Sequence, residues 1–150
     1  MRQFAHYLYV VAITLWVGSL WAIGYISAPT LFLFVADRSL AGTVAGKQFA
    51  AVAYLGMACA AYLFAYLFFS EGARAFRLLV LWLIALMLLL VLAGHFGVAP
   101  IIEQLRGATA REMVEGVVRN RFQTWHGIAS LLWLIQSVLG LALVTQVFRR

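Results

Sequence analysis

The sequence predicts an all-α integral membrane protein, a bundle of four transmembrane helices in a single domain of residues 1–150. Three observations support this. The composition, 65% hydrophobic and 11% charged, is too apolar for a soluble domain of this size. Long uncharged stretches recur four times along the chain. These stretches are rich in Leu and Ala without strict alternation, which favours helices over a β-barrel.

The four predicted spans cover about residues 4–28, 48–70, 78–99 and 122–148. Each is long enough to cross hydrocarbon roughly 30 Å thick, which takes about 20 helical residues. The first span begins directly after Met1-Arg2-Gln3 and is longer than the apolar region of a secretory signal. We therefore expect it to remain as an anchor.

Local signals predict where these helices begin, end or bend. Ala28-Pro29 and Ala99-Pro100 predict helix ends or kinks, because proline disfavours a helical residue before it. Asp37 offers an N-cap for a helix that continues into the second span. A capping-box pattern that begins at Thr109 predicts a short amphipathic helix over about 109–119, lying on the membrane.

The same sequence signals occur in the same order in the two halves of the chain. Each has an Ala-Pro pair, a polar lead-in and an aromatic-x-Gly-x-Ala element, at Tyr54–Ala58 and Trp125–Ala129. This order suggests a duplicated hairpin. Two segments of such biased composition would share nearly as many identical residues by chance as the two halves do. The repeat therefore stays a hypothesis.

Charge and cysteine content exclude several classes of partner. The net charge of +6 comes from residues in short segments beside the spans, so we expect a lipid bilayer as partner and no nucleic acid. Cys59 is the single cysteine, which excludes an intrachain disulfide. Lys and Arg are nearly balanced between the two sides. We expect both termini in the cytoplasm, because the longer loops carry the amphipathic helix and can be exported.

Histidines within the spans are the candidate ligand site. His95 and His126 lie roughly 6 Å inside the same interface at 1.5 Å per residue, with Tyr25 and Tyr54 at comparable depth and Ser130 one turn from His126. Two neutral imidazoles at one depth could bind a copper-like metal or the iron of haem b. Alternatively, they hydrogen-bond a carbonyl or a headgroup.

His6 lies near the opposite interface and is a second possible ligand site. It cannot share a metal with the other two histidines. The spans contain no nucleophile with a base, no phosphate-binding loop and no paired carboxylates, so the sequence favours a protein that is not an enzyme.

Small residues predict the faces on which helices pack closely. They are Gly18, Gly42, Gly46, Gly127, Ser137 and Gly140. Gly42 and Gly46 belong to a small-xxx-small pattern, while Ser137 and Gly140 continue a stripe that begins at His126 in the fourth span.

Several motifs carry a resemblance to a known family. They are His6, Leu15-Trp16-x-Gly18-x-x-Trp21-x-x-Gly24-Tyr25-x-x-Ala28-Pro29, Asp37-Arg38, Ala41-Gly42-x-x-Ala45-Gly46 and Phe122-x-x-x-His126-Gly127-x-x-Ser130. Together they resemble bacterial members of the transmembrane protein 205-like family over essentially the whole chain. The resemblance implies a four-helix protein of the bacterial inner membrane whose function is largely unknown. Eukaryotic relatives are linked to resistance to platinum drugs, which implies handling of soft metals.

The first span is also similar to two other families of small four-helix membrane proteins. His6, Trp16 and Gly18 match the copper-resistance D type and the haem-binding protoporphyrinogen oxidase type. The oxidase family has a lysine in its third span, and this chain has none there.

Three functions therefore remain open. The first is a non-enzymatic protein that binds, or helps to move, a metal or other small ligand at the histidine layer. The second is an accessory subunit that packs against a larger membrane complex or another copy of itself, through the Gly42 and Gly46 face and through exposed aromatic surfaces. The third is a haem-dependent oxidoreductase.

Overall fold

The fold is all-α, as the sequence predicts. The computed structural model describes residues 2–111 and 117–147, with side chains over 3–106 and 120–147. Its elements are α1 (Arg2–Trp21), η1 (Ala22–Ser27), α2 (Ala28–Phe34), α3 (Arg38–Glu71), η2 (Gly72–Arg77), α4 (Leu79–Leu92), η3 (Ala93–Val98), α5 (Ala99–Arg111) and α6 (Val117–Val147). Four continuous helical stretches are long and apolar enough to cross a membrane: Gln3–Phe34, Arg38–Arg77, Leu79–Arg106 and Asn120–Val147. The prediction of four spans is confirmed.

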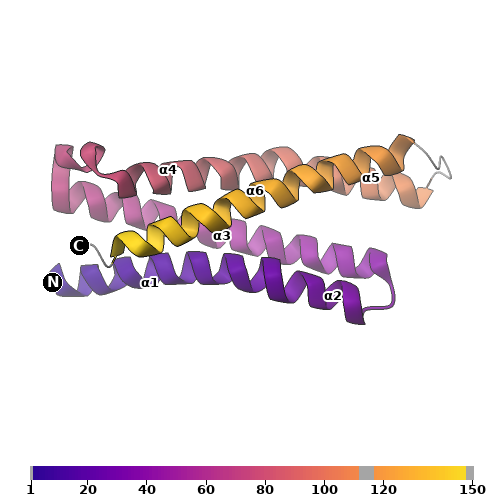
Figure 1. Cartoon of the computed structure of the whole chain (residues 1–150), viewed down its shortest axis with the longest axis horizontal. Coiled ribbons are helices and arrows are strands. Elements are labelled where there is room, and N and C mark those ends of the chain that lie inside the picture. Colours follow the sequence, from indigo (N-terminus) through magenta and orange to yellow (C-terminus); the bar gives the residue numbers. More distant parts are fainter. Residues whose placement is uncertain (1, 112–116, 148–150) are drawn as a thin grey trace.

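The helices form two hairpins that lie side by side (Figure 1). The first contains α1, α2 and α3, and the second contains α4, α5 and α6. The start of α1 and the end of α6 lie at one end of the bundle, and the ends of α2 and α5 lie at the other (Figure 1). Helix α1 packs against α3, α3 against α4, α4 against α6 and α6 against α1, so the four rods close into a ring.

Of the two outcomes predicted at Pro29 and Pro100, a helix end or a kink, the helix end is wrong, because neither proline ends its helix. Both prolines follow a π-helix, η1 or η3, and the helix continues beyond them. The N–H of Ala28 bonds to the carbonyl of Ile23, and the N–H of Ala99 bonds to that of Gly94, each five residues back. Proline has no N–H and its ring crowds the preceding turn. The wider π turn lets the chain pass this point without breaking.

The two π-helices support the hypothesis of a duplicated hairpin. Residues 22–27 and 93–98 are 71 positions apart, as are Pro29 and Pro100. The same offset joins Gly56 to Gly127 in the two aromatic-x-Gly-x-Ala elements. The shared backbone irregularity shows that the two Ala-Pro pairs have the same structural effect in both hairpins.

The predicted cap at Asp37 is confirmed. Its carboxylate accepts hydrogen bonds from the N–H groups of Ser39 and Leu40 at the start of α3, 2.8 and 3.2 Å away. The amphipathic helix predicted over about 109–119 is only partly within the described residues. Residues 109–111 form the end of α5 and 117–119 the start of α6, while 112–116 lie outside the described residues.

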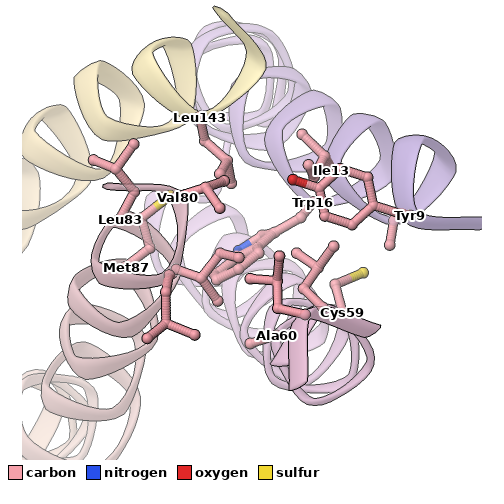
Figure 2. Close-up of a cluster of buried hydrophobic side chains, with 14 of the residues drawn as sticks. Tyr9, Ile13, Trp16, Cys59, Ala60, Val80, Leu83, Met87 and Leu143 are labelled. Carbon is pink, nitrogen blue, oxygen red and sulfur yellow. The ribbon is translucent and has the colours of Figure 1, made fainter. Parts of the chain in front are cut away.

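The hydrophobic core lies toward the end of the bundle that holds the termini. Side chains from α1, α3, α4 and α6 converge there (Figure 2). Those labelled in Figure 2 are Tyr9, Ile13, Trp16, Cys59, Ala60, Val80, Leu83, Met87 and Leu143. By contrast, η1 contains no buried residue.

Trp16 is the central side chain of this core and depends on a glycine. Its side chain is 0% exposed. A Cβ atom at Gly56 of α3 would lie 2.6 Å from Trp16 Nε1, closer than van der Waals contact allows. The indole therefore packs directly on the backbone of α3, which holds α1 and α3 close together.

We expect Gly56→Ala to destabilise the bundle by about 1–3 kcal/mol, because the enclosed Trp16 ring cannot move away from an added methyl group. Gly127→Ala is the matched control, since no atom lies within 4 Å of a Cβ there. It should be neutral, or stabilising by up to about 1 kcal/mol through helix propensity. Reversible unfolding in mixed detergent micelles measures both. Equal losses would contradict the proposed Trp16 contact.

Candidate functional site

A chain of hydrogen bonds joins the two hairpins at η1. The hydroxyl of Tyr25 donates to Ser137 Oγ over 2.8 Å, and Ser137 Oγ donates to the carbonyl of Trp133 over 2.9 Å. Ser137 is buried in α6. Because Ser137 Oγ both accepts and donates, the two bonds polarise one another. η1 is thereby tied to the second hairpin by a neutral polar contact.

His95 makes the corresponding contact from η3. Its ring meets that of Tyr54 on α3 edge to face, with centroids 4.9 Å apart and an interplanar angle of 71°. The neighbouring Phe96 ring lies 4.8 Å away. Each π-helix therefore presents a polar or aromatic side chain to the second helix of the opposite hairpin.

Neither His95 nor His126 hydrogen-bonds a protein group within the described residues. His95 is half-buried, and its contacts are the two ring contacts above. The alternative in which these histidines bond a protein carbonyl therefore has no support here. An imidazole inside a span that lacks a protein partner is available to a ligand.

Trp133 fills the space between the hairpins near η1. A Cβ at Gly24 would overlap its indole, so position 24 must be glycine for the ring to fit. Phe49 of α3 packs on the indole edge to face, with centroids 4.7 Å apart. Among the described residues, Trp133 Nε1 is one of the buried polar atoms without a hydrogen-bond partner.

The N–H of Trp133, which has no partner among the described residues, lies beside Gly24 in η1. Five residues further on, Pro29 has no N–H, so the bond that residue 29 of an ordinary helix would donate to this turn is missing. Trp133 therefore packs on the helical turn that precedes the proline.

Sequence reasoning missed two other polar contacts at this level. Ser27 Oγ donates to Gln48 Oε1 over 2.8 Å, which links η1 to α3. Gln136 Nε2 donates to the carbonyl of Met87 over 3.2 Å, which links α6 to α4. Ser27 and Gln48 lie at the ends of two successive predicted spans, and that shared depth was the signal available to find them.

The other predicted members of the layer lie toward the outside of α6. His126 and Ser130 are exposed. The His126 ring stacks on Phe122, with centroids 5.9 Å apart, and Ser130 donates to the His126 carbonyl over 2.9 Å. No hydrogen bond or ring contact joins His126 to His95. Within the described residues, no group of three or more His, Cys, Asp or Glu side chains could hold a metal ion.

His6 lies in a separate cluster on α1. Its Nδ1 is 3.3 Å from the hydroxyl of Tyr66, and its ring stacks on Tyr9 at a centroid distance of 6.1 Å. The rings of Tyr9 and Tyr66 lie 4.8 Å apart. His6 therefore has a hydrogen-bonding partner in the protein, the hydroxyl of Tyr66, which distinguishes it from His95.

The small residues predicted at helix contacts divide into two groups. A Cβ at Gly140 would lie 3.2 Å from both methyl groups of Val17, and one at Gly42 would lie 3.2 Å from the Arg106 guanidinium. Gly46 is exposed and more loosely covered, with Arg106 Nη1 3.9 Å from its Cβ position. Gly18 and Gly127 have no atom within 4 Å of a Cβ, so they do not pack against another helix of this chain.

The bond between Tyr25 and Ser137 predicts a measurable coupling between the hairpins. In a double-mutant cycle of Tyr25→Phe and Ser137→Ala, we expect a coupling of about 0.6 kcal/mol, the usual size for a hydrogen bond between membrane helices. Unfolding in mixed micelles measures it. Tyr54→Phe is the control, because its hydroxyl has no hydrogen bond within the described residues and should couple to Ser137→Ala by zero within error. Zero coupling for Tyr25 as well would argue against the bridge.

Comparison with known families covers the first three spans. The domain of unknown function DUF4149 matches residues 11–111, which contain Tyr25, Tyr54 and His95 but not His126. No curated protein and no solved structure matches the chain. Because the match spans most of the chain, this four-helix membrane protein belongs to the DUF4149 family.

Proposed function

We propose that this protein is a non-enzymatic multi-pass membrane protein that binds, or helps to move, a small ligand between its two hairpins. The observation that carries the proposal is His95. It is half-buried within a span, lies in a π-helix and has no hydrogen-bond partner among the described residues. Polar groups are costly in a membrane, and π-helices occur frequently at functional sites.

A copper-like metal ion is the first ligand to consider, and haem b the second. Neutral imidazole suits both copper and iron. His95 on η3 and His126 on α6 belong to elements that pack together, so His126 is the candidate second ligand. Two imidazoles leave coordination positions that the ligand itself, water or another chain would fill. The resemblance to the transmembrane protein 205-like family supports handling of a soft metal.

The metal proposal predicts that the purified protein binds copper and that His95→Ala and His126→Ala each weaken binding by about tenfold, the lower range for loss of metal-site groups. His6→Ala is the control and should bind as the wild type does, because His6 lies at the other end of the bundle. Copper titration with metal analysis, together with the visible spectrum after haem addition, distinguishes the two ligands. Binding that survives loss of both layer histidines would overturn the proposal.

The alternative of an accessory subunit loses support at one of its two proposed surfaces. Gly42, proposed as part of a contact with a partner, is buried and already covered by Arg106 of the same chain. A haem-dependent oxidoreductase would require a Soret band from the purified protein, and the haem titration above tests that alternative.

The proposed location is the bacterial inner membrane, with both termini in the cytoplasm. The two termini lie at the same end of the bundle, so a single fusion reports on both (Figure 1). A C-terminal fluorescent protein that folds only in the cytoplasm should be bright, and an alkaline phosphatase fusion at the same position should be inactive. A dark reporter with an active phosphatase would reverse the orientation.

A further inference from the structure

Arg106 reaches from the second hairpin to the first and lies on bare backbone. A Cβ at Gly42 would be 3.2 Å from both Cζ and Nη2 of Arg106, and a Cβ at Gly46 would be 3.9 Å from Nη1. Gly42 and Gly46 are one turn apart on the same face of α3. The flat guanidinium therefore lies along a glycine strip on α3, and a side chain at position 42 would displace it.

The Arg106 cation has no partner in the described part of the chain. It makes no hydrogen bond and no ion pair there. Glu103, one turn earlier on α5, is exposed and does not pair with it. Arg106 is half-buried, and none of its nitrogens is among the fully buried atoms without a partner, so the guanidinium stays accessible from outside the bundle. It carries five N–H donors, and the contact with Gly42 supplies no acceptor for them.

The depth of Arg106 indicates which acceptor is available. The uncharged run of the third span ends at Ile102, and Glu103 and Arg106 are the first charged residues after it. Arg106 therefore lies where hydrocarbon gives way to headgroups. Lys47, next to Gly46 on α3, is exposed and adds a second positive charge beside the glycine strip. A guanidinium fork matches two oxygens of a phosphate group, and a neighbouring ammonium strengthens the attraction.

We propose that Arg106, seated on Gly42 with Lys47 beside it, binds the phosphate group of an anionic phospholipid. The site involves both hairpins, because Arg106 lies on α5 and its glycine seat on α3. A bound lipid would therefore stabilise the bundle at the end where the core is thinnest, as any ligand selective for the folded state does. This site is independent of the ligand of His95.

The test compares three probes on the full-length protein in a non-ionic detergent. The probes are phosphatidylglycerol, phosphatidylcholine with the same acyl chains, and inorganic phosphate. Native mass spectrometry counts retained lipid, and thermal unfolding gives the affinities. We expect phosphatidylglycerol to bind about tenfold tighter than phosphatidylcholine, the effect of charge-assisted hydrogen bonds. Inorganic phosphate should give no shift at equal concentration. Equal binding of both lipids, or an equal shift from free phosphate, would overturn the lipid assignment.

Matched variants assign the preference to this seat. Arg106→Gln and Gly42→Val should each lose the tenfold preference. Arg38→Gln, which removes an exposed arginine at the same end, and Gly46→Ala should keep it. Arg106→Lys keeps the charge without the planar fork, so we expect an intermediate preference for phosphatidylglycerol. This variant shows whether the loss in Arg106→Gln comes from the missing charge or from a folding defect. Equal losses in Arg38→Gln and Arg106→Gln would show general surface attraction and overturn the site.

Discussion

Backbone hydrogen bonding inside the membrane is the constraint on which this structure depends. In hydrocarbon an unpaired N–H or carbonyl costs several kcal/mol, so each span must satisfy its own backbone. Pro29 and Pro100 interrupt that pairing within the first and third membrane-spanning stretches. The chain responds with a π-helix before each proline instead of ending the helix. The same irregularity presents Tyr25 and His95 to the opposite hairpin, so the solution to a backbone problem also places the candidate site.

Close packing of aromatic rings on glycine holds the helices together here, as the hydrophobic effect does in soluble proteins. Lipid tails are as apolar as a leucine side chain, so helices in a membrane gain little from burying leucine alone. Trp16 on Gly56 joins α1 to α3, and Trp133 on Gly24 joins α6 to η1. The first contact lies within the first hairpin, and the second joins the two hairpins. The hydrogen bonds between helices in the described part of the chain are few and join neutral groups, as expected inside a membrane.

Much of this fold follows from the sequence, because span length, apolar composition and the Asp37 cap act locally. The π-helices could not be predicted, since the same Ala-Pro pairs are compatible with an end, a kink or a wider turn. Side-chain partners were predicted less well. Depth along a helix placed Tyr25, Tyr54 and His95 in one layer, but it could not determine which face each would present. Gly18 and Gly127 resemble packing glycines in the sequence, yet only neighbouring helices decide whether such a residue is covered.

The π-helices also bear on how the chain tolerates changes in length. A π turn holds one residue more than the α-helical turn that it replaces. Loss of a single residue from 22–27 would restore an ordinary α-helical turn. Because the π turn covers about the same rotation with one residue more, the helix beyond it would keep its orientation. Ala28 would stay buried, and α2 would offer the same face to α3. Single-residue gaps in these two segments are therefore length changes that folded relatives can accommodate.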